Sequence, residues 1–378
     1  MQYRDFGRTG VKLSALGMGC MRLPVIDGDI NRINEDKAIE LIRRAIDGGV
    51  NYVDTAWGYH GGNSEALVAK ALKDGYREKV FLATKLPCYL IEKREDMDYY
   101  LNKQLERLNT DHIDFYLLHA LNSKTWKTVR DNGVFEFIET AKKDGRIRYI
   151  GFSFHDDYPV FEDIINSYDW DFCQIQYNII DEDFQAGLKG LRLAASREMG
   201  VVIMEPLRGG GLTNNIPENI QKAWRVLTPE RTPADWCLSW LWDQPEVGIV
   251  LSGMTKPEHV DENLKIADRS AVHKLKKYEK DHIKKIRDMY HARTIINCTG
   301  CAYCMPCPHN VDIPNCFQYL NLASMINNWA EGKRLYKLLV LDKGKGASNC
   351  VACGECLEKC PQRLPIPETL KLVVEKFE

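Results

Sequence analysis

The chain has 378 residues, more than one hydrophobic core usually supports, so a large domain with an appendage is expected. Its 51 Lys and Arg residues against 53 Asp and Glu residues leave a formal net charge of −2, which excludes a broad basic field for nucleic acid. The sequence opens without an apolar signal core and contains no apolar run long enough to span a bilayer, so a cytoplasmic protein without membrane partners is expected.

A β-hairpin is predicted at the start of the chain. In YRDFGRTGVKLS, residues 3–14, a turn around Arg8, Thr9 and Gly10 separates two short runs. Because this hairpin precedes the first long apolar run, it would close the floor of the fold that follows.

Eight short apolar runs then alternate with stretches of helical spacing up to residue 268. The runs cover residues 15–20, 51–56, 80–86, 112–119, 149–154, 172–178, 200–207 and 247–253. The first intervening stretch has its apolar residues on one helical face and ends at Gly48 and Gly49. Strand and helix repeated eight times over about 250 residues predict an α/β fold of the (β/α)8 TIM-barrel type. A doubly wound open sheet is the alternative, although no G-x-G-x-x-G follows the first strand.

Polar residues follow three consecutive strands, at the strand ends where such barrels carry their chemistry. Asp54 ends the second strand and Tyr59 follows it, while Lys85 ends the third strand and His119 the fourth. Taken singly, Tyr59 or His119 would pass for an ordinary polar residue, but unpaired charges after apolar runs are costly, so Asp54 and Lys85 are expected to pair.

The four residues together suit the protonation of an oxygen that becomes negative while a hydride reaches the attached carbon. Lys85 is expected to favour the phenolate and thus to lower the pKa of Tyr59, which would act as the general acid. Asp54 would orient Lys85, and His119 would be a second donor to the substrate carbonyl.

Three of these stretches resemble the aldo-keto reductases. NYVDTAWGYHGGNSEALVAKAL is similar to the family's D-T-A-x-x-Y stretch with its following Ser-Glu helix, VFLATKL to its lysine strand and HIDFYLLHAL to its histidine strand. The resemblance covers residues 1 to about 268 and implies an oxidoreductase that uses a nicotinamide cofactor to reduce a carbonyl or oxidise the alcohol. It also implies that four residues form a catalytic tetrad: Asp54, Tyr59, Lys85 and His119.

Two loops, after the seventh and eighth strands, are candidates for holding the cofactor phosphates, because barrels commonly bind phosphate there. In the second loop Thr255 is expected as N-cap, with Pro257 in the first turn and Glu258 completing a T-x-x-E capping box. Backbone N–H groups between Gly253 and the helix would face a phosphate, unless this is only a well-capped helix. In the first loop, the glycine run beside Arg208 would close over the pyrophosphate or serve as a permissive turn.

The resemblance also implies contacts to the rest of the cofactor. Ser153 and Gln174 would contact the nicotinamide carboxamide, and Glu262 and Asn263 the adenine. All four residues lie in the predicted barrel, in or after its later strands.

The sequence departs from the family pattern at three cofactor positions. Phe154 stands where an Asn usually follows the serine, and Met204 where an aromatic residue usually stacks on the nicotinamide. His259 aligns with the usual basic residue near the 2′-phosphate, and Lys256 is another candidate for that phosphate. The cofactor is therefore expected to be NADP(H) or NAD(H), with the choice left open.

The organisation of the chain changes after residue 268. Residues 269–293 predict a charged helical connector, and residues 294–378 hold nine of the 13 cysteines. Such clustering is typical of metal ligation in a reducing compartment rather than of disulfides. The expected domains are thus a barrel over residues 1–268, the connector, and a cysteine-rich domain over residues 294–378.

Eight of these cysteines form two runs that each end in Cys-Pro. The later run has the bacterial ferredoxin spacing C-x2-C-x2-C-x3-C-P, and its ligands would be Cys350, Cys353, Cys356 and Cys360. The earlier run is one residue shorter before its last cysteine, and its ligands would be Cys298, Cys301, Cys304 and Cys307. The two runs predict two 4Fe-4S clusters, and zinc held by four thiolates is the alternative.

In the ferredoxin pattern three thiolates of a run bind one cluster and the fourth reaches the other cluster. One cluster would then be bound by Cys298, Cys301, Cys304 and Cys360, and the other by Cys350, Cys353, Cys356 and Cys307. The shorter spacing makes Cys307 the weakest of these assignments, and Cys316 is either a substitute ligand or a buried free thiol. The residues between the runs predict helices, so the module resembles a helical dicluster ferredoxin.

The whole chain resembles the aldo-keto reductases that carry such a C-terminal module. A hydride carries two electrons and a cubane cluster ordinarily passes one, so direct exchange needs a carrier such as a flavin, for which no dinucleotide motif is visible. One expected function is a carbonyl reductase or alcohol dehydrogenase whose clusters serve relay, sensing or structure, with an electron-transfer protein as a candidate partner. The alternative is a redox-sensing or electron-relay protein whose barrel binds nucleotide, and the intact tetrad favours the enzyme.

Overall fold

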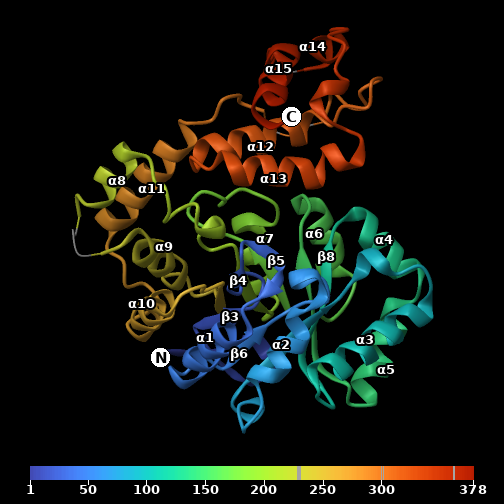
Figure 1. The fold of residues 1–378 in the computed structure, drawn as a ribbon, viewed down its shortest axis with the longest axis vertical. Helices are drawn as coiled ribbons and strands as arrows, with labels where there is room; N and C mark the ends of the chain where they lie inside the picture. The colour runs from blue at the N-terminus through green and yellow to red at the C-terminus, as the bar shows by residue number, and fades with distance from the viewer. Residues whose placement is uncertain (228–230, 299, 301, 361) are drawn as a thin grey trace. The chain divides into compact units, whose positions relative to one another are not determined.

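A computed structural model of the chain describes residues 1–227, 231–298, 300, 302–360 and 362–378 (Figure 1). The chain divides into two compact units, each built from two stretches of sequence. The first unit holds Met1–Gly209 and Ala234–Lys277, and the second holds Gly210–Pro233 and Tyr278–Glu378. The sequence carried no signal that residues 210–233, between two predicted barrel elements, would fold with the C-terminal stretch.

Eight parallel strands close into a barrel in the first unit. In chain order they are β3 (Leu16–Gly19), β6 (Tyr52–Asp54), β7 (Phe81–Leu86), β8 (Ile113–Leu121), β9 (Ile147–Phe154), β10 (Phe172–Gln176), β11 (Gly200–Met204) and β12 (Ile249–Ser252). Each strand overlaps the run predicted for it, and β12 pairs with β3 to complete the ring. The (β/α)8 prediction is confirmed, and the closed ring rules out an open doubly wound sheet.

Helices follow the strands along the chain, as the alternating pattern predicts (Figure 1). They are α1 (Glu35–Asp47), α2 (Ser64–Ala71), α3 (Arg94–Leu108), α4 (Ser123–Asp131), α5 (Val134–Lys143), α6 (Tyr158–Asn166), α7 (Gly187–Ser196), α9 (Pro233–Trp242) and α10 (Pro257–Asp268). The buried residues of α1 recur every three or four positions, which gives the helix one apolar face: Ala38, Leu41, Ile42, Ala45 and Ile46.

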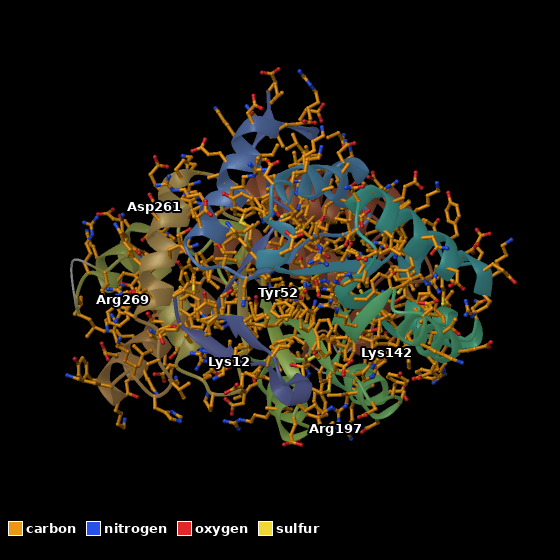
Figure 2. The ribbon with its side chains drawn as sticks, turned by 90° about the horizontal axis from the view of Figure 1, so that it is seen from below. Lys12, Tyr52, Lys142, Arg197, Asp261 and Arg269 are labelled. Carbon is orange, nitrogen blue, oxygen red and sulfur yellow. The ribbon has the colours of Figure 1, made fainter. Side chains whose placement is uncertain are left out.

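The predicted N-terminal hairpin is present and closes the barrel floor. β1 (Tyr3–Asp5) pairs antiparallel with β2 (Lys12–Ser14), and Phe6 between them is buried. The ring of Phe6 lies 5.5 Å from that of Phe115 and 5.9 Å from that of Phe172, near the starts of β8 and β10. Figure 2 looks at the molecule from below, with Lys12 labelled on the hairpin and Tyr52 at the start of β6.

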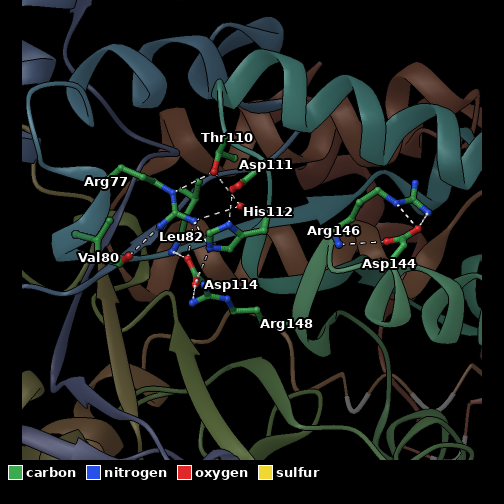
Figure 3. Close-up of polar contacts among 10 residues, drawn as sticks. All are labelled: Arg77, Val80, Leu82, Thr110, Asp111, His112, Asp114, Asp144, Arg146 and Arg148. Atoms are coloured by element: carbon green, nitrogen blue, oxygen red, sulfur yellow. Dashed lines mark hydrogen bonds and ion pairs between the residues drawn. The ribbon is translucent and has the colours of Figure 1, made fainter.

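A buried carboxylate holds neighbouring strands together near the same floor (Figure 3). Asp114, the second residue of β8, accepts hydrogen bonds from the backbone N–H of Leu82 at 2.9 Å and from Arg148 Nη1 at 2.8 Å. Arg77 Nη2 lies 2.8 Å from the same carboxylate. Because each oxygen has a charged or backbone donor, the charge is compensated although the side chain is only 2% exposed.

The second unit is helical where the structure describes it. Its helices are α8 (Glu218–Trp224), α11 (Lys277–His291), α12 (Ile313–Met325), α13 (Trp329–Leu339), α14 (Glu355–Lys359) and α15 (Ile366–Phe377). Phe317 and Leu320 of α12, Tyr336 of α13 and Val373 of α15 are fully buried and form its core. Among the helices described in either unit, none is long and apolar enough to cross a membrane.

Candidate active site

The structure brings Asp54, Lys85, Tyr59 and His119 together at the C-terminal ends of three neighbouring strands. β6, β7 and β8 are adjacent in the barrel, with Asp54 opposite Ala83 and Lys85 opposite Leu117. Because parallel strands in register end at the same rim, their terminal side chains meet there.

Lys85 is the centre of the arrangement and is completely buried. Its ammonium nitrogen donates to Asp54 Oδ1 at 2.7 Å, to Asp54 Oδ2 at 2.8 Å and to the carbonyl of Thr55 at 2.7 Å. It also lies 3.3 Å from the hydroxyl of Tyr59. Burial lowers the pKa of Lys85, but the negative charges of Asp54 and of an ionised Tyr59 raise it by more, so the net pKa is raised and the ammonium stays charged.

Tyr59 differs from the prediction in the direction of its pKa. Burial raises the pKa of Tyr59, and this effect exceeds the lowering by Lys85. Asp54 neutralises part of the Lys85 charge and adds a further upward contribution to that pKa. Lys85 does lower the pKa of Tyr59, as predicted, but burial outweighs it, so the expected net lowering of that pKa is wrong and Lys85 only limits the rise. The hydroxyl stays protonated, as a proton donor must.

His119 faces Tyr59, with the two rings nearly perpendicular and their centroids 5.9 Å apart. Burial lowers the pKa of His119 far below its ordinary range, and the charges of Lys85 and His155 lower it further, so the ring is neutral. Among the described residues, no partner bonds to its Nδ1. The ring is thus not committed to a structural hydrogen bond through that atom.

The two candidates for the nicotinamide carboxamide lie opposite each other on β9 and β10. Ser153 pairs in register with Gln174, and both side chains are buried. The hydroxyl of Ser153 accepts from the N–H of Ala120 at 2.7 Å, and Gln174 Nε2 lies 3.5 Å from Met204 Sδ. Gln174 Oε1 has no partner among the residues that the structure describes. A buried, unpaired acceptor fits the amide N–H groups of a carboxamide.

The start of α10 differs from the prediction. Lys256, rather than Thr255, is the N-cap, and no side chain caps the helix. Proline disfavours a helical conformation in the residue before it, so Pro257 holds Lys256 extended, at φ −142° and ψ 152°. The expected Thr255 and Glu258 capping box is absent, and Thr255 Oγ1 instead lies 3.4 Å from His259 Nδ1. The first N–H groups of α10 therefore lack the side-chain acceptor that was predicted.

Arg208 is paired with a buried carboxylate. Its Nε and Nη2 lie 2.8 and 3.0 Å from the two oxygens of Asp181. Asp181 also accepts from Gln176 Nε2 at 2.8 Å and from Asn178 Nδ2 at 2.7 Å. The same amide of Asn178 donates to the carbonyl of Glu205 at 2.9 Å. The loop after β11 is thus fixed from β10 and its loop, and the role of Arg208 at a pyrophosphate stays a prediction.

Two residues near the cofactor positions lacked a recognised sequence signal. Arg22 Nη2 lies 2.7 Å from Glu205 Oε1, which joins the loop after β3 to the loop after β11. A Cβ added to Gly253 would lie 3.2 Å from Arg22 Cβ, so this loop also approaches the end of β12. The position of Arg22, just after the first barrel strand, could have identified it.

Asn263, a predicted adenine contact, is buried and donates to Ser252 Oγ at 3.0 Å, while Glu262 is half-buried.

The cysteines of the second unit line two hollows. One hollow is lined by Cys304, Cys307, Cys350, Cys353 and Cys356, and the other by Cys298, Cys304 and Cys360. Cys301 lies outside the described residues. Among the described side chains, no three potential ligands meet closely enough to hold a single metal ion. Cys316 lines neither hollow, and burial raises the pKa of its thiol to about 12.

Both parts of the chain match known families. The model of the aldo/keto reductase family matches residues 15–288, and that of a 4Fe-4S dicluster domain matches residues 297–364. The NADH-specific methylglyoxal reductase of Escherichia coli (strain K12) is 29% identical over 313 residues, which are 70% of this chain and 93% of that protein.

Solved structures show the same architecture. The holo form of aldo-keto reductase AKR11C1 from Bacillus halodurans has 26% identity and a TM-score of 0.64, covering 76% of this chain and 96% of that one. An aldo-keto reductase from Klebsiella pneumoniae in complex with NADPH has 22% identity and a TM-score of 0.61, covering 76% and 96%, and shares the fold.

Proposed function

Because the chain belongs to the aldo/keto reductase family, we propose that it reduces a small carbonyl compound, or oxidises the alcohol, with a nicotinamide cofactor. The observation that carries this proposal is the contact of buried Lys85 with Asp54 at 2.7 Å and with the Tyr59 hydroxyl at 3.3 Å. The buried ion pair lies beside a protonated tyrosine, at the rim where barrel enzymes carry their active sites. This arrangement suits proton transfer to a substrate oxygen.

The residues of the tetrad would divide the proton chemistry among them. A bound nicotinamide would supply the hydride to the carbonyl carbon. Tyr59 donates its proton to the carbonyl oxygen as negative charge develops there. Lys85 stabilises the phenolate left on Tyr59, and Asp54 holds Lys85 in place. Neutral His119 donates a second hydrogen bond to the same oxygen, where a fixed donor stabilises developing charge.

The cofactor is proposed to be NADP(H) or NAD(H). The unpaired Gln174 Oε1 and the neighbouring Ser153 would hold the carboxamide, with Met204 beside them. Around the uncapped start of α10 and the loop after β11, the proposed phosphate and adenine contacts are Arg208, Gly253, Thr255, Lys256, His259, Glu262 and Asn263. The E. coli relative is named for NADH. Activity should therefore be assayed with NADH as well as with NADPH.

Two 4Fe-4S clusters are proposed for the second unit, in keeping with the dicluster match. The crossed assignment is supported by the two hollows, because Cys307 lines one with Cys350, Cys353 and Cys356. Cys360 lines the other with cysteines of the earlier run. The donors are all thiols, which suit cubane clusters. When bound, the clusters would supply one-electron chemistry for relay or sensing, or serve structure alone.

The test of the catalytic proposal is the Tyr59→Phe variant. Loss of the hydroxyl should lower kcat for reduction of methylglyoxal or a simple aldehyde by about 10²-fold or more, the usual loss for a general acid. Affinity for NADPH and NADH, measured by fluorescence titration, should change little. A variant that turns over at the parental rate would exclude Tyr59 from the chemistry. A parental protein that binds nucleotide but reduces no carbonyl would favour the relay or sensing function.

A further inference from the structure

The residue after Tyr59 has an unusual environment. His60 is only 3% exposed, and its backbone is left-handed, with φ 53° and ψ 43°. This conformation is uncommon for a residue other than glycine, although histidine adopts it more readily than most residues. The mechanism proposed above gives His60 no task, although it shares a peptide bond with Tyr59.

The imidazole of His60 joins two points of a distant segment. Its Nδ1 lies 2.7 Å from the carbonyl oxygen of Ile30, and the N–H of Leu23 donates to its Nε2 at 3.1 Å. The carbonyl can only accept and the amide can only donate, so the partners assign the hydrogen to Nδ1 and a lone pair to Nε2. His60 therefore acts as a neutral ring with both nitrogens used.

The segment that His60 contacts is a hairpin after the first barrel strand. β4 (Val25–Ile26) and β5 (Asp29–Ile33) pair antiparallel. The loop that carries Tyr59 approaches this hairpin closely at two further points. Asn63 Nδ2 donates to the carbonyl of Asn31 at 3.0 Å, and a Cβ added to Gly61 would lie 2.3 Å from Asn31 Oδ1. The hairpin and the loop therefore form one packed joint.

The position of Tyr59 depends on this joint. Within its turn the N–H of Tyr59 donates to the carbonyl of Ala56 at 3.2 Å, but its hydroxyl reaches Lys85 only at 3.3 Å, near the upper limit of a hydrogen bond. A small rotation of the loop would separate the two groups. The ring of His60, anchored at both ends, opposes such a rotation.

We propose that His60 is a positioning residue for Tyr59, which it fixes by clamping the catalytic loop onto the hairpin at Leu23 and Ile30. The inference rests on the proposed function, because it concerns the same proton donor. A misplacement of about 1 Å in a reacting group can cost as much as 10²-fold in rate, so the clamp should act on kcat.

Three variants separate the effect of the His60 ring contacts from the effect of its left-handed backbone conformation. His60→Ala removes both ring contacts, and His60→Gly also removes them while suiting the left-handed backbone. His60→Asn keeps an amide that can donate toward Ile30, and Asn tolerates the left-handed region. Ile30→Ala is the matched control, because its side chain is 57% exposed while the bond to His60 uses its carbonyl.

We expect His60→Ala and His60→Gly to lower kcat for carbonyl reduction about 10-fold to 10²-fold, with the nucleotide dissociation constant changed less than about twofold. His60→Asn should recover part of kcat, and Ile30→Ala should keep the parental kcat. Parental kcat in His60→Gly would overturn the proposal. Equal losses in all three His60 variants together with weaker nucleotide binding would assign the residue to general stability and also overturn it.

Tyr59→Phe, measured beside these variants, separates the two proposals. If Tyr59→Phe loses activity while His60→Ala does not, the positioning role fails and the general acid remains. If Tyr59→Phe keeps the parental rate, the catalytic proposal itself fails. Thermal unfolding of each variant shows whether a loss of kcat comes from loss of folded protein.

Discussion

The neighbouring strands β7 and β8 carry one buried charge near each end of the barrel, Asp114 of β8 near the floor and Lys85 of β7 at the rim, and the two charges have different surroundings. Near the floor, the carboxylate of Asp114 accepts from a backbone N–H at 2.9 Å and from Arg148 at 2.8 Å, with Arg77 also at 2.8 Å. These partners come from the turn before β7, from β7 itself and from β9 (Figure 3). The charge of Asp114 therefore has a structural role, because all of its contacts hold neighbouring segments together.

At the opposite rim the buried charges are also paired, but nearby side chains have polar atoms without a hydrogen-bond partner. Lys85 and Asp54 compensate each other, while His119 Nδ1 and Gln174 Oε1 have no partner among the described residues. The hydroxyl of Tyr59 lies at 3.3 Å from Lys85 and keeps its proton. Burial of charge is thus common to both ends, whereas the carboxylate of Asp114 is fully bonded and two side chains at the rim keep unused hydrogen-bonding capacity.

The strongest test of this comparison removes the charge of Lys85. Lys85→Met leaves the carboxylate of Asp54 buried without its partner, so kcat should fall by about 10³-fold or more as both the proton donor and its support are disturbed. The free energy of unfolding should also fall, by about 3–5 kcal/mol. Steady-state kinetics and denaturant titration measure the two effects. A variant with only one of the two losses would separate catalysis from stability at this end.

The matched change at the floor is Asp114→Asn. It removes the charge that pairs with Arg77 and Arg148 but leaves an amide oxygen that can still accept a hydrogen bond, and Arg148 is 54% exposed, so the free energy of unfolding should fall by about 1–3 kcal/mol. Because the site is at the other ends of the strands, kcat of the folded protein should stay within about twofold of the parent. A large loss of kcat in fully folded Asp114→Asn would break the division between scaffold and site.

Two cysteines of the second unit allow the same comparison between a residue that lines a candidate site and one that only packs in the core. Cys353 is exposed in a thiol-lined hollow, whereas Cys316 is buried and lines neither hollow. Cys353→Ala should cost one of two clusters, or about half of the iron and sulfide of anaerobically purified protein. Cys316→Ala should retain the parental content. Stoichiometric zinc without sulfide in the parent would contradict the cluster assignment altogether.

The smallest effect concerns pH. Tyr59 must be protonated to act as an acid, and its pKa is raised above the ordinary 10.0 by burial. The kcat for reduction should therefore stay level up to pH 10 and fall only above it, when the hydroxyl loses its proton. A decline that begins well below pH 10 and is absent in Tyr59→Phe would show that Lys85 outweighs burial when substrate is bound.

Much of the barrel followed from local pattern. Apolar runs separated by helical stretches specify eight strands, and polar residues at three consecutive run ends specify which side chains meet, because register in a parallel barrel places strand ends on one rim. The cysteine runs likewise indicated a ferredoxin-like module by spacing alone, and a dicluster family model matches there.

Other features depended on contacts between distant residues. The pKa of Tyr59 is set by the depth of its burial, which a sequence does not give, so the effect of Lys85 was overestimated. The N-cap of α10 moved to Lys256 because the backbone restriction before Pro257 outweighed the side-chain preference of Thr255.

The sequence by itself determined the strands, the rim and the chemical types gathered there, because these follow from periodicity and from neighbouring positions. Only the tertiary structure decided which polar groups are bonded to other parts of the protein and which remain free to bind a ligand. Asp181 holds Arg208 from another loop, and the ring of His60 bridges to Leu23 and Ile30, which lie 37 and 30 residues away in the chain. Such bonds join segments whose proximity is created by closure of the barrel, so no local pattern encodes them.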